Sequence, residues 1–311
     1  MPESAPEALR VVGAEFLRSF KVIPTDTMLE HEKHYFPLFY VQKNDSQFLF
    51  DRLLHLEPSK KGEGHSVAMY KSDTEQVVVK AVLNPGFEDV EMVKIVNLLA
   101  IDDLKIVDAI VAYEGEPFER TARRTRPRPN NFCVILMNYV GKTLSLKFPP
   151  AHEAEMRLRL NLCLEIAREC QKLLQFNLIY ADLKTSNIAI DEHGQCILLD
   201  YGSIYIVGSR SACSTFPPPE NPRGTNILAS ERLVVYDIGV LLAFCLHGDL
   251  VNKFRYLTDT TEEFASLSIQ SAINWTIENT VDINIKKILN YALNNKDANI
   301  ASFIDQLKNV N

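Results

Sequence analysis

The local sequence pattern changes near residues 140–142, and this change constrains the fold more than any other feature. Before it, short β-branched and aromatic runs alternate with turn-rich stretches, and residues 67–83 predict a β-hairpin. After it, residues 151–176 carry apolar positions at a helical spacing, and the chain beyond residue 228 is mostly helical in pattern. Strands followed by helices predict an α+β protein in two parts.

Other segments also have a recognisable local pattern. Residues 5–20 and 88–100 have apolar positions at helical spacing and predict two short helices. Residues 35–57, 105–114 and 132–140 are rich in aromatic and β-branched side chains and predict extended structure. The two parts of the chain are therefore expected to differ in secondary structure as well as in packing.

Charge and cysteine content exclude several classes of protein. The net charge of −7 gives no basic field that would attract nucleic acid, so nucleic-acid binding is not expected. None of the six cysteines forms a CxxC pair, which indicates reduced thiols and no structural zinc. The first residues lack a signal-peptide pattern, and the most apolar run, 234–246, is too short to span a bilayer. We expect an intracellular protein, cytoplasmic or nuclear, without membrane contact.

Polar groups suited to phosphate and metal chemistry recur at four places. Glycine turns let backbone N–H groups approach a phosphate, and a lysine on an apolar strand supplies a positive charge. Carboxylate and amide oxygens are hard ligands that suit Mg²⁺. In chain order the four places are Gly62-Glu63-Gly64, Lys80 at the end of Val-Val-Val-Lys, Asp182-x-Lys184-x-x-Asn187, and Asp200-Tyr201-Gly202.

The spacing of the last two places predicts that they meet. Asp200 follows Asp182 by eighteen residues, which leaves room for the two short apolar strands IAI and CILLD with a DEHG turn between them. A DxKxxN run alone is common by chance, whereas the whole ordered set is not. We therefore expect both aspartates in one cleft.

These motifs resemble those of the eukaryotic-type protein kinases. VVVK resembles the family's VAIK, YADLKTSN resembles HRDLKxxN, and DYG resembles DFG. The segment 135–141 is similar to the linker between the two kinase lobes, and 215–220 to the APE end of the activation segment. The resemblance runs from about residue 52 to about residue 246.

The resemblance implies a two-lobed kinase-like fold. Residues 51–138 would form the β-rich N-lobe and residues 139–311 the helical C-lobe. Residues 1–50 would be an N-terminal extension packing on the N-lobe.

It also implies transfer of the ATP γ-phosphate to Ser/Thr hydroxyls of protein substrates. Asp182 would accept the hydroxyl proton and Lys184 would steady the γ-phosphate. Asn187 and Asp200 would hold Mg²⁺.

For ATP itself, the resemblance implies a site formed by residues before the linker and in it. Gly62 and Gly64 would approach the phosphates, with Lys80 as their charged partner. Adenine would lie against Asn138–Val140, with Met137 at the back of the pocket.

The carboxylate that orients Lys80 has three candidates. Glu88, Asp89 and Glu91 all qualify, and Glu91 is slightly preferred by its distance from Lys80 in sequence. An acidic run can equally be a favourable charge at a helix N-terminus. The choice between them stays open at this point.

Departures from the family pattern keep other functions open. Val67 stands at the third glycine of the phosphate loop, and Ala181 replaces an arginine that reads a phosphate on the activation segment. Tyr180 and Tyr201 replace a histidine and a phenylalanine but keep aromatic rings. A pseudokinase acting as a nucleotide- or partner-binding scaffold is one alternative, and a small-molecule kinase of the same fold is another.

The same resemblance also assigns roles to two further acidic residues and indicates an origin. Asp237 matches a buried helix aspartate that braces the catalytic loop, and Glu220 an ion-pairing residue of the activation segment. The short lobes, DYG and missing arginine are similar to divergent kinases of large DNA viruses, with secreted bacterial effector kinases as the alternative. Either origin would place the protein in a host cell.

Overall fold

The structure is a computed structural model. It describes residues 156–248 and 261–310 with their side chains, apart from residues 192, 211 and 213. In the preceding part of the chain it describes the backbone of the strands. Side chains are also described at single positions: 78, 96, 99, 104, 105, 140, 143, 144 and 254.

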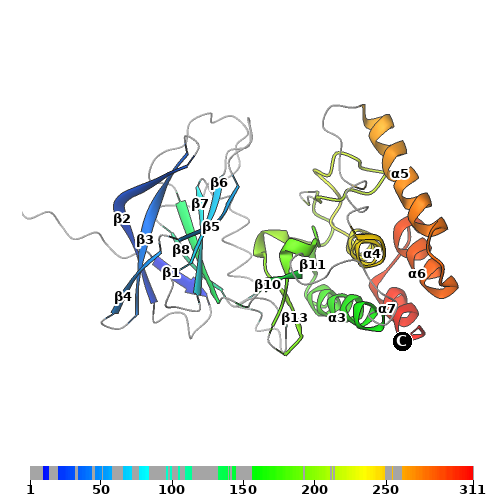
Figure 1. The fold of residues 1–311 in the computed structure, drawn as a ribbon, viewed down its shortest axis with the longest axis horizontal. Helices are drawn as coiled ribbons and strands as arrows, with labels where there is room; N and C mark the ends of the chain where they lie inside the picture. Colours follow the sequence, from blue (N-terminus) through cyan, green and yellow to red (C-terminus); the bar gives the residue numbers. More distant parts are fainter. Residues whose placement is uncertain are drawn as a thin grey trace, which may run out of the picture. The chain divides into compact units, whose positions relative to one another are not determined.

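The chain divides into two compact units, and its described part is α+β. One unit comprises Met1–Ala100 with Val107–Val140, and the other Ile101–Ile106 with Gly141–Asn311. Strands dominate the described residues of the first unit, and the second contains five described helices with small sheets (Figure 1).

The first unit contains a six-stranded antiparallel sheet and a separate three-stranded one. The larger sheet has the order β1-β8-β9-β7-β6-β5, and the smaller one β2-β3-β4. The hairpin predicted for residues 67–83 is confirmed as β6 and β7. The bounds are β1 (Arg10–Gly13), β2 (Phe20–His31), β3 (His34–Lys43), β4 (Ser46–Phe50), β5 (Arg52–Glu57), β6 (Ser66–Lys71), β7 (Val77–Leu83), β8 (Ala109–Tyr113) and β9 (Phe132–Asn138).

The helix predicted over residues 5–20 is wrong. Arg10–Gly13 forms strand β1, in which Val11 pairs with Ala112 and Val12 with Val111 of β8. Two adjacent β-branched residues suit such an edge position, and strand pairing overrides the local helical spacing. A helical spacing in so short a segment does not determine its structure when the segment pairs with a strand that is distant in sequence.

In the second unit, two small antiparallel sheets carry the loops of interest. One sheet has the order β10-β12-β13, and the other pairs β11 with β14. The two short apolar strands predicted after residue 187 are confirmed as β12 and β13. The bounds are β10 (Lys142–Thr143), β11 (Leu178–Tyr180), β12 (Ile188–Ile190), β13 (Cys196–Leu198) and β14 (Ile204–Ile206).

Helix α4 is the centre of the helical core. It packs on α3, α6 and α7, and Figure 1 views it nearly along its axis. Its residues from Leu233 to Ala243 are all buried, which is typical of a helix that is apolar all round. The bounds are α3 (Met156–Leu174), α4 (Glu231–His247), α5 (Glu262–Glu278), α6 (Ile283–Asn294) and α7 (Ile300–Lys308).

Gly239 permits the close approach of α4 and α6. A Cβ atom at this position would lie 2.7 Å from Cβ of Ala292 and 3.0 Å from Cδ2 of Leu293. These distances are shorter than ordinary carbon–carbon contacts. The absence of a side chain at Gly239 therefore sets the spacing of the two helices.

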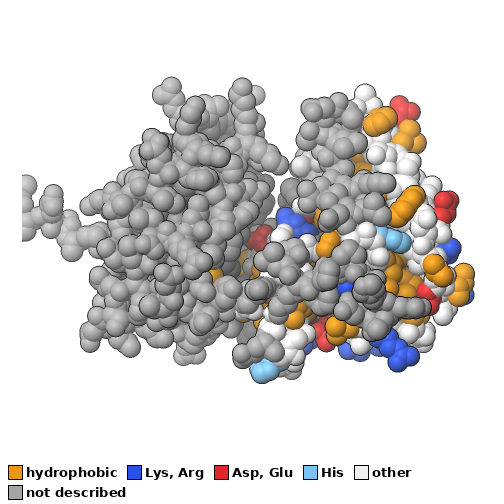
Figure 2. Space-filling view, viewed as in Figure 1, with side chains coloured by type: hydrophobic (Ala, Val, Ile, Leu, Met, Phe, Trp, Pro, Cys, Tyr) orange, Lys and Arg blue, Asp and Glu red, His pale blue; other side chains and the backbone are white. Residues whose placement is uncertain are grey.

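The surface of the helical unit carries isolated apolar side chains. Phe264 and Leu267 on α5 and Ile283 at the start of α6 are exposed. Figure 2 shows apolar side chains scattered among polar ones on the visible face of this unit, a normal distribution for a protein surface. Among the described residues, no helix combines the length and apolar character needed to cross a bilayer.

Candidate active site

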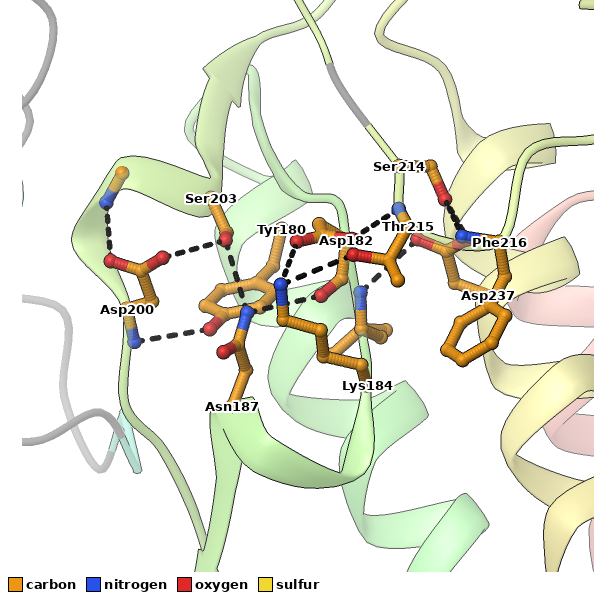
Figure 3. A network of polar contacts seen from close by, with 12 residues as sticks. Tyr180, Asp182, Lys184, Asn187, Asp200, Ser203, Ser214, Thr215, Phe216 and Asp237 are labelled. Carbon is orange, nitrogen blue, oxygen red and sulfur yellow. Dashed lines mark hydrogen bonds and ion pairs between the residues drawn. The ribbon is translucent and has the colours of Figure 1, made fainter. Parts of the chain in front are cut away.

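The two small sheets bring three chain segments together. Because β11 pairs with β14, and β12 with β13, the loop 181–187 lies beside the loop 199–203. The amide of Ala181 donates to the carbonyl of Ser203 at 2.7 Å and ties the two loops directly. Residues 214–216 complete a polar network with them, shown in Figure 3.

Asp182 is held in an uncommon backbone conformation by charge-assisted contacts. Its φ of 56° is left-handed, a region that aspartate tolerates better than most residues. Oδ1 accepts the backbone N–H of Thr215 at 2.6 Å, and Oδ2 lies 2.7 Å from Nζ of Lys184. Nζ also donates to the Thr215 hydroxyl at 3.2 Å. Backbone strain maintained by surrounding contacts is typical of functional sites.

Asn187 and Asp200 are linked through one hydroxyl. The amide nitrogen of Asn187 donates to the carbonyl of Asp182 at 3.2 Å and to Oγ of Ser203 at 3.4 Å. Oγ of Ser203 in turn donates to Oδ2 of Asp200 at 3.3 Å. Oδ1 of Asp200 accepts the amide of Gly202 at 3.2 Å. The chain of contacts therefore runs from the Asp182 loop to the Asp200 loop without a break.

The buried side chain of Tyr180 is hydrogen-bonded to the backbone of Asp200. Its ring is fully buried, and its hydroxyl accepts the backbone N–H of Asp200 at 3.1 Å. Burial raises the pKa of this phenol well above its ordinary value, and the nearby charge of Asp200 adds to the effect. Tyr201 is buried as well. Both rings are buried, as expected from the sequence, and the Tyr180 hydroxyl adds a hydrogen bond to the Asp200 backbone.

Asp237 of α4 braces the Asp182 loop from within the core. This carboxylate is 1% exposed and accepts the Leu183 amide and the Ser214 hydroxyl, each at 3.2 Å. Burial raises its pKa well above the usual value, and repulsion from Asp182 acts in the same direction. The hydrogen bonds from Leu183 and Ser214 oppose that shift. Asp237 thus ties α4 to both polar segments.

Glu220 pairs with Arg232 at the start of α4. Nε of Arg232 lies 3.6 Å from Oε1 of Glu220, and its terminal nitrogens donate to the carbonyls of Ala292 and Leu293. Burial lowers the pKa of the guanidinium. This pairing anchors the end of the 214–220 segment to α4 and α6, in agreement with the ion pair expected for Glu220.

The structure describes some of the predicted site residues with their side chains, some by strand position only, and others not at all. It brings together the predicted catalytic and metal-binding side chains, which are Asp182, Lys184, Asn187 and Asp200. For Lys80, Met137 and Asn138 it gives strand positions, with Lys80 opposite Ile135 and Met137 opposite Val78. Val140 is half-buried. Gly62, Gly64, Glu88, Asp89 and Glu91 lie outside the described residues.

Sequence reasoning missed the role of three hydroxyl residues. Ser203, Ser214 and Thr215 form hydrogen bonds to Asp200, Asp237 and Asp182, respectively. Ser203 directly follows the DYG motif, which is a positional signal that could have identified it. Thr215 and Ser214 reach Asp182 and Asp237 only through the tertiary fold, so their spacing carried no such signal.

Neither similarity to known proteins nor a cluster of metal-ligating side chains assigns a function to this site. No protein-family model matches the chain, and a search of curated proteins finds no match. Within the described residues, no three His, Cys, Asp or Glu side chains gather in a way that could hold a metal ion. A metal at this site would therefore depend on mixed donors, namely the carboxylate of Asp200 with the amide oxygen of Asn187.

Proposed function

We propose that the protein is a serine/threonine-type protein kinase with the two-lobed kinase fold, and that it transfers the ATP γ-phosphate to protein hydroxyls. The proposal depends on one observation, a hydrogen-bonded network that joins the four predicted chemical groups: Asp182, Lys184, Asn187 and Asp200. A polar turn with only a structural role needs no such combination of base, cation and two metal-type ligands.

Asp182 is suited to act as the base for the substrate hydroxyl. Its side chain is 17% exposed, so an incoming hydroxyl can reach it. Thr215 and Lys184 each use one direction on the carboxylate, which has about four acceptor directions in all. The same two contacts fix the orientation of the carboxylate before substrate arrives, which lowers the cost of reaching the reactive geometry.

Lys184 is suited to hold the phosphoryl group that is transferred. Its side chain is 29% exposed and its ammonium group lies beside Asp182, where charge moves during transfer. A fixed cation next to the reacting oxygens stabilises the developing negative charge. Its contact with the Thr215 hydroxyl restricts the position of Nζ.

Asn187 and Asp200 offer hard oxygen donors that fit Mg²⁺. When bound, Mg²⁺ would neutralise charge on the phosphate oxygens. The two hydrogen bonds of Asn187 both use its amide nitrogen, so its amide oxygen is the atom that neither contact occupies. For ATP, the expected binding residues are Gly62, Gly64, Lys80, Glu91, Met137, Asn138 and Val140.

The alternative is a scaffold that binds nucleotide or a partner without transfer. It is favoured by the two contacts that already engage both oxygens of Asp182. Val67 in place of the third glycine also favours the scaffold, because a β-branched residue stiffens a turn. The retained combination of Lys80, Asp182 and Asp200 favours the enzyme instead.

Transfer of labelled phosphate separates these functions. Wild type is incubated with γ-labelled ATP, Mg²⁺ and a panel of generic protein substrates, beside Asp182→Asn. Loss of the base is expected to lower incorporation by about 10²–10⁴-fold. Asp191→Asn is the matched control, because among the described residues the Asp191 side chain accepts the turn amides of His193 and Gln195, which asparagine can also do.

The control should retain wild-type incorporation. If wild type transfers no more label than Asp182→Asn across all substrates and with both Mg²⁺ and Mn²⁺, the enzyme proposal is wrong. Thermal stabilisation by ATP under that outcome would support the binding scaffold.

A further inference from the structure

The Ser203 hydroxyl lies between the two expected metal ligands, Asn187 and Asp200, and contacts both. It accepts from Nδ2 of Asn187 at 3.4 Å and donates to Oδ2 of Asp200 at 3.3 Å. The side chain is buried, with 3% of the residue exposed. A buried hydroxyl must find partners, so bonding alone is unremarkable. Ser203 also shares a hydrogen bond with the Tyr180 side chain. The specific feature is that its other two partners, Asn187 and Asp200, are the residues expected to hold the metal.

The direction of these bonds determines which end of Asn187 faces the hydroxyl. A serine hydroxyl has one hydrogen, and donating it to the Asp200 carboxylate leaves only acceptor capacity for Asn187. Asn187 must then present its NH₂ group to Ser203, and the same group reaches the Asp182 carbonyl at 3.2 Å. Its amide oxygen therefore takes part in neither contact and remains available as a ligand atom for a cation.

The position of Ser203 does not depend on its hydroxyl. Its amide donates to the carbonyl of Asp200 at 3.1 Å, and its carbonyl accepts from Ala181 at 2.7 Å. The residue is also the last of the short helical turn Tyr201–Ser203, which leads directly into β14. Removal of the hydroxyl should consequently leave the loops in place and remove only its side-chain contacts, which are those to Asn187, Asp200 and Tyr180.

We propose that Ser203 is a positioning residue for the metal site. It holds Asn187 with its amide oxygen available and keeps the Asp200 carboxylate in register with it. Both contacts are longer than the roughly 2.8–3.0 Å optimum, so the hydroxyl orients the ligands while still allowing them to adjust. This inference rests on the proposed function, because it takes Asn187 and Asp200 as metal ligands.

Mn²⁺ binding tests the inference without using catalysis. Mn²⁺ is titrated into the full chain with a non-hydrolysable ATP analogue, and the free-ion EPR signal reports binding. Ser203→Ala is expected to bind about 10–100-fold more weakly than wild type, the usual effect of losing a group that orients metal ligands. Ser203→Thr keeps the hydroxyl and should recover most of the affinity. Ser266→Ala is the control, since its hydroxyl bonds to the Pro219 carbonyl away from this network.

The outcomes separate two kinds of failure. If wild type binds no Mn²⁺ beyond what the nucleotide chelates alone, the metal-dependent function itself fails. If wild type binds and a folded Ser203→Ala binds equally well, only the role of Ser203 is overturned. Should Ser203→Ala not fold, Ser203→Cys replaces it, because a thiol is a weak donor and acceptor. Equal affinity of the Cys and Thr variants would then contradict the proposal.

Discussion

Asp182 in the polar network and Asp237 in the helical core around α4 differ in exposure, backbone conformation and partners. Asp182 is partly exposed, lies at a left-handed φ and contacts a lysine. Asp237 is 1% exposed, lies in a regular helix and accepts hydrogen bonds from Leu183 and Ser214. The first arrangement suits reactivity and the second suits support. Activity and stability should therefore be separable by mutation.

After loss of the Asp182 base, the largest expected effect comes from removing the cation of the network. Lys184→Met should lower phosphate transfer by about 10²–10³-fold, because a fixed group that stabilises developing charge is lost. Its unfolding midpoint should change little, since partly exposed ion pairs contribute modestly to stability. Label incorporation and thermal unfolding measure the two effects.

Lys172→Met is the matched control for this change. Lys172 is similarly exposed, at 30% of its side chain, and also pairs with a carboxylate, Glu169, at 3.1 Å. It should retain transfer activity. Equal losses of transfer activity in Lys184→Met and Lys172→Met would contradict a specific role of the network in phosphate transfer.

In the core, Gly239→Ala should reduce stability instead of chemistry. The new Cβ would lie 2.7 Å from Ala292, so α4 and α6 must move apart, at about 1–3 kcal/mol for overpacking. In a solvent-exposed helix the same change stabilises by about 0.5–1 kcal/mol. The sign of the change in the free energy of unfolding therefore distinguishes the two situations. Urea unfolding gives the free energy, and a stabilised variant would show that α4 and α6 are not so closely packed.

Asp237 should make the stability of the core depend on pH. Because its folded-state pKa is raised above the ordinary value of about 3.9, the folded state keeps a proton that the unfolded state loses. Its contribution is present in acid and is lost as pH rises through the folded-state pKa. The free energy of unfolding of wild type relative to Asp237→Asn should therefore fall as pH rises above about 4. A difference that stays flat or rises with pH would contradict the buried state of this carboxyl.

The smallest expected effect is at the start of α6. The Asp282 side chain accepts the amides of Asn284 at 2.7 Å and Ile285 at 3.0 Å, which otherwise lack helix partners. Asp282→Ala should cost about 1 kcal/mol of stability, with transfer activity unchanged. Chemical denaturation and the transfer assay together check this, and a loss of activity would show that the two regions are coupled more widely than the account allows.

Local patterns predicted the elements that are self-contained in sequence. The hairpin of β6 and β7, helix α3 and the short strands β12 and β13 all carry a clear period or a turn signal. The first strand was mistaken for a helix because its structure depends on pairing with β8. Sequence spacing is informative where an element's partner is its neighbour, and fails where the partner is distant.

The same distinction applies to the site. Asp182, Lys184, Asn187 and Asp200 were predicted from residue types and spacing, and the structure joins them in one network. Thr215 contacts Asp182 from 33 residues away, so no local pattern indicated it. Hydroxyl residues are common in loops, and only the tertiary fold distinguishes those that orient an aspartate.

The central claim is that the Asp182 network transfers phosphate to Ser/Thr hydroxyls. The most direct measurement is mass spectrometry of protein substrates after incubation with ATP and Mg²⁺ and either wild type or Asp182→Asn. The account predicts phosphoserine and phosphothreonine in the wild-type reaction and background levels with the variant. The same modified sites in both reactions, modification confined to tyrosine, or no modified residue would contradict it.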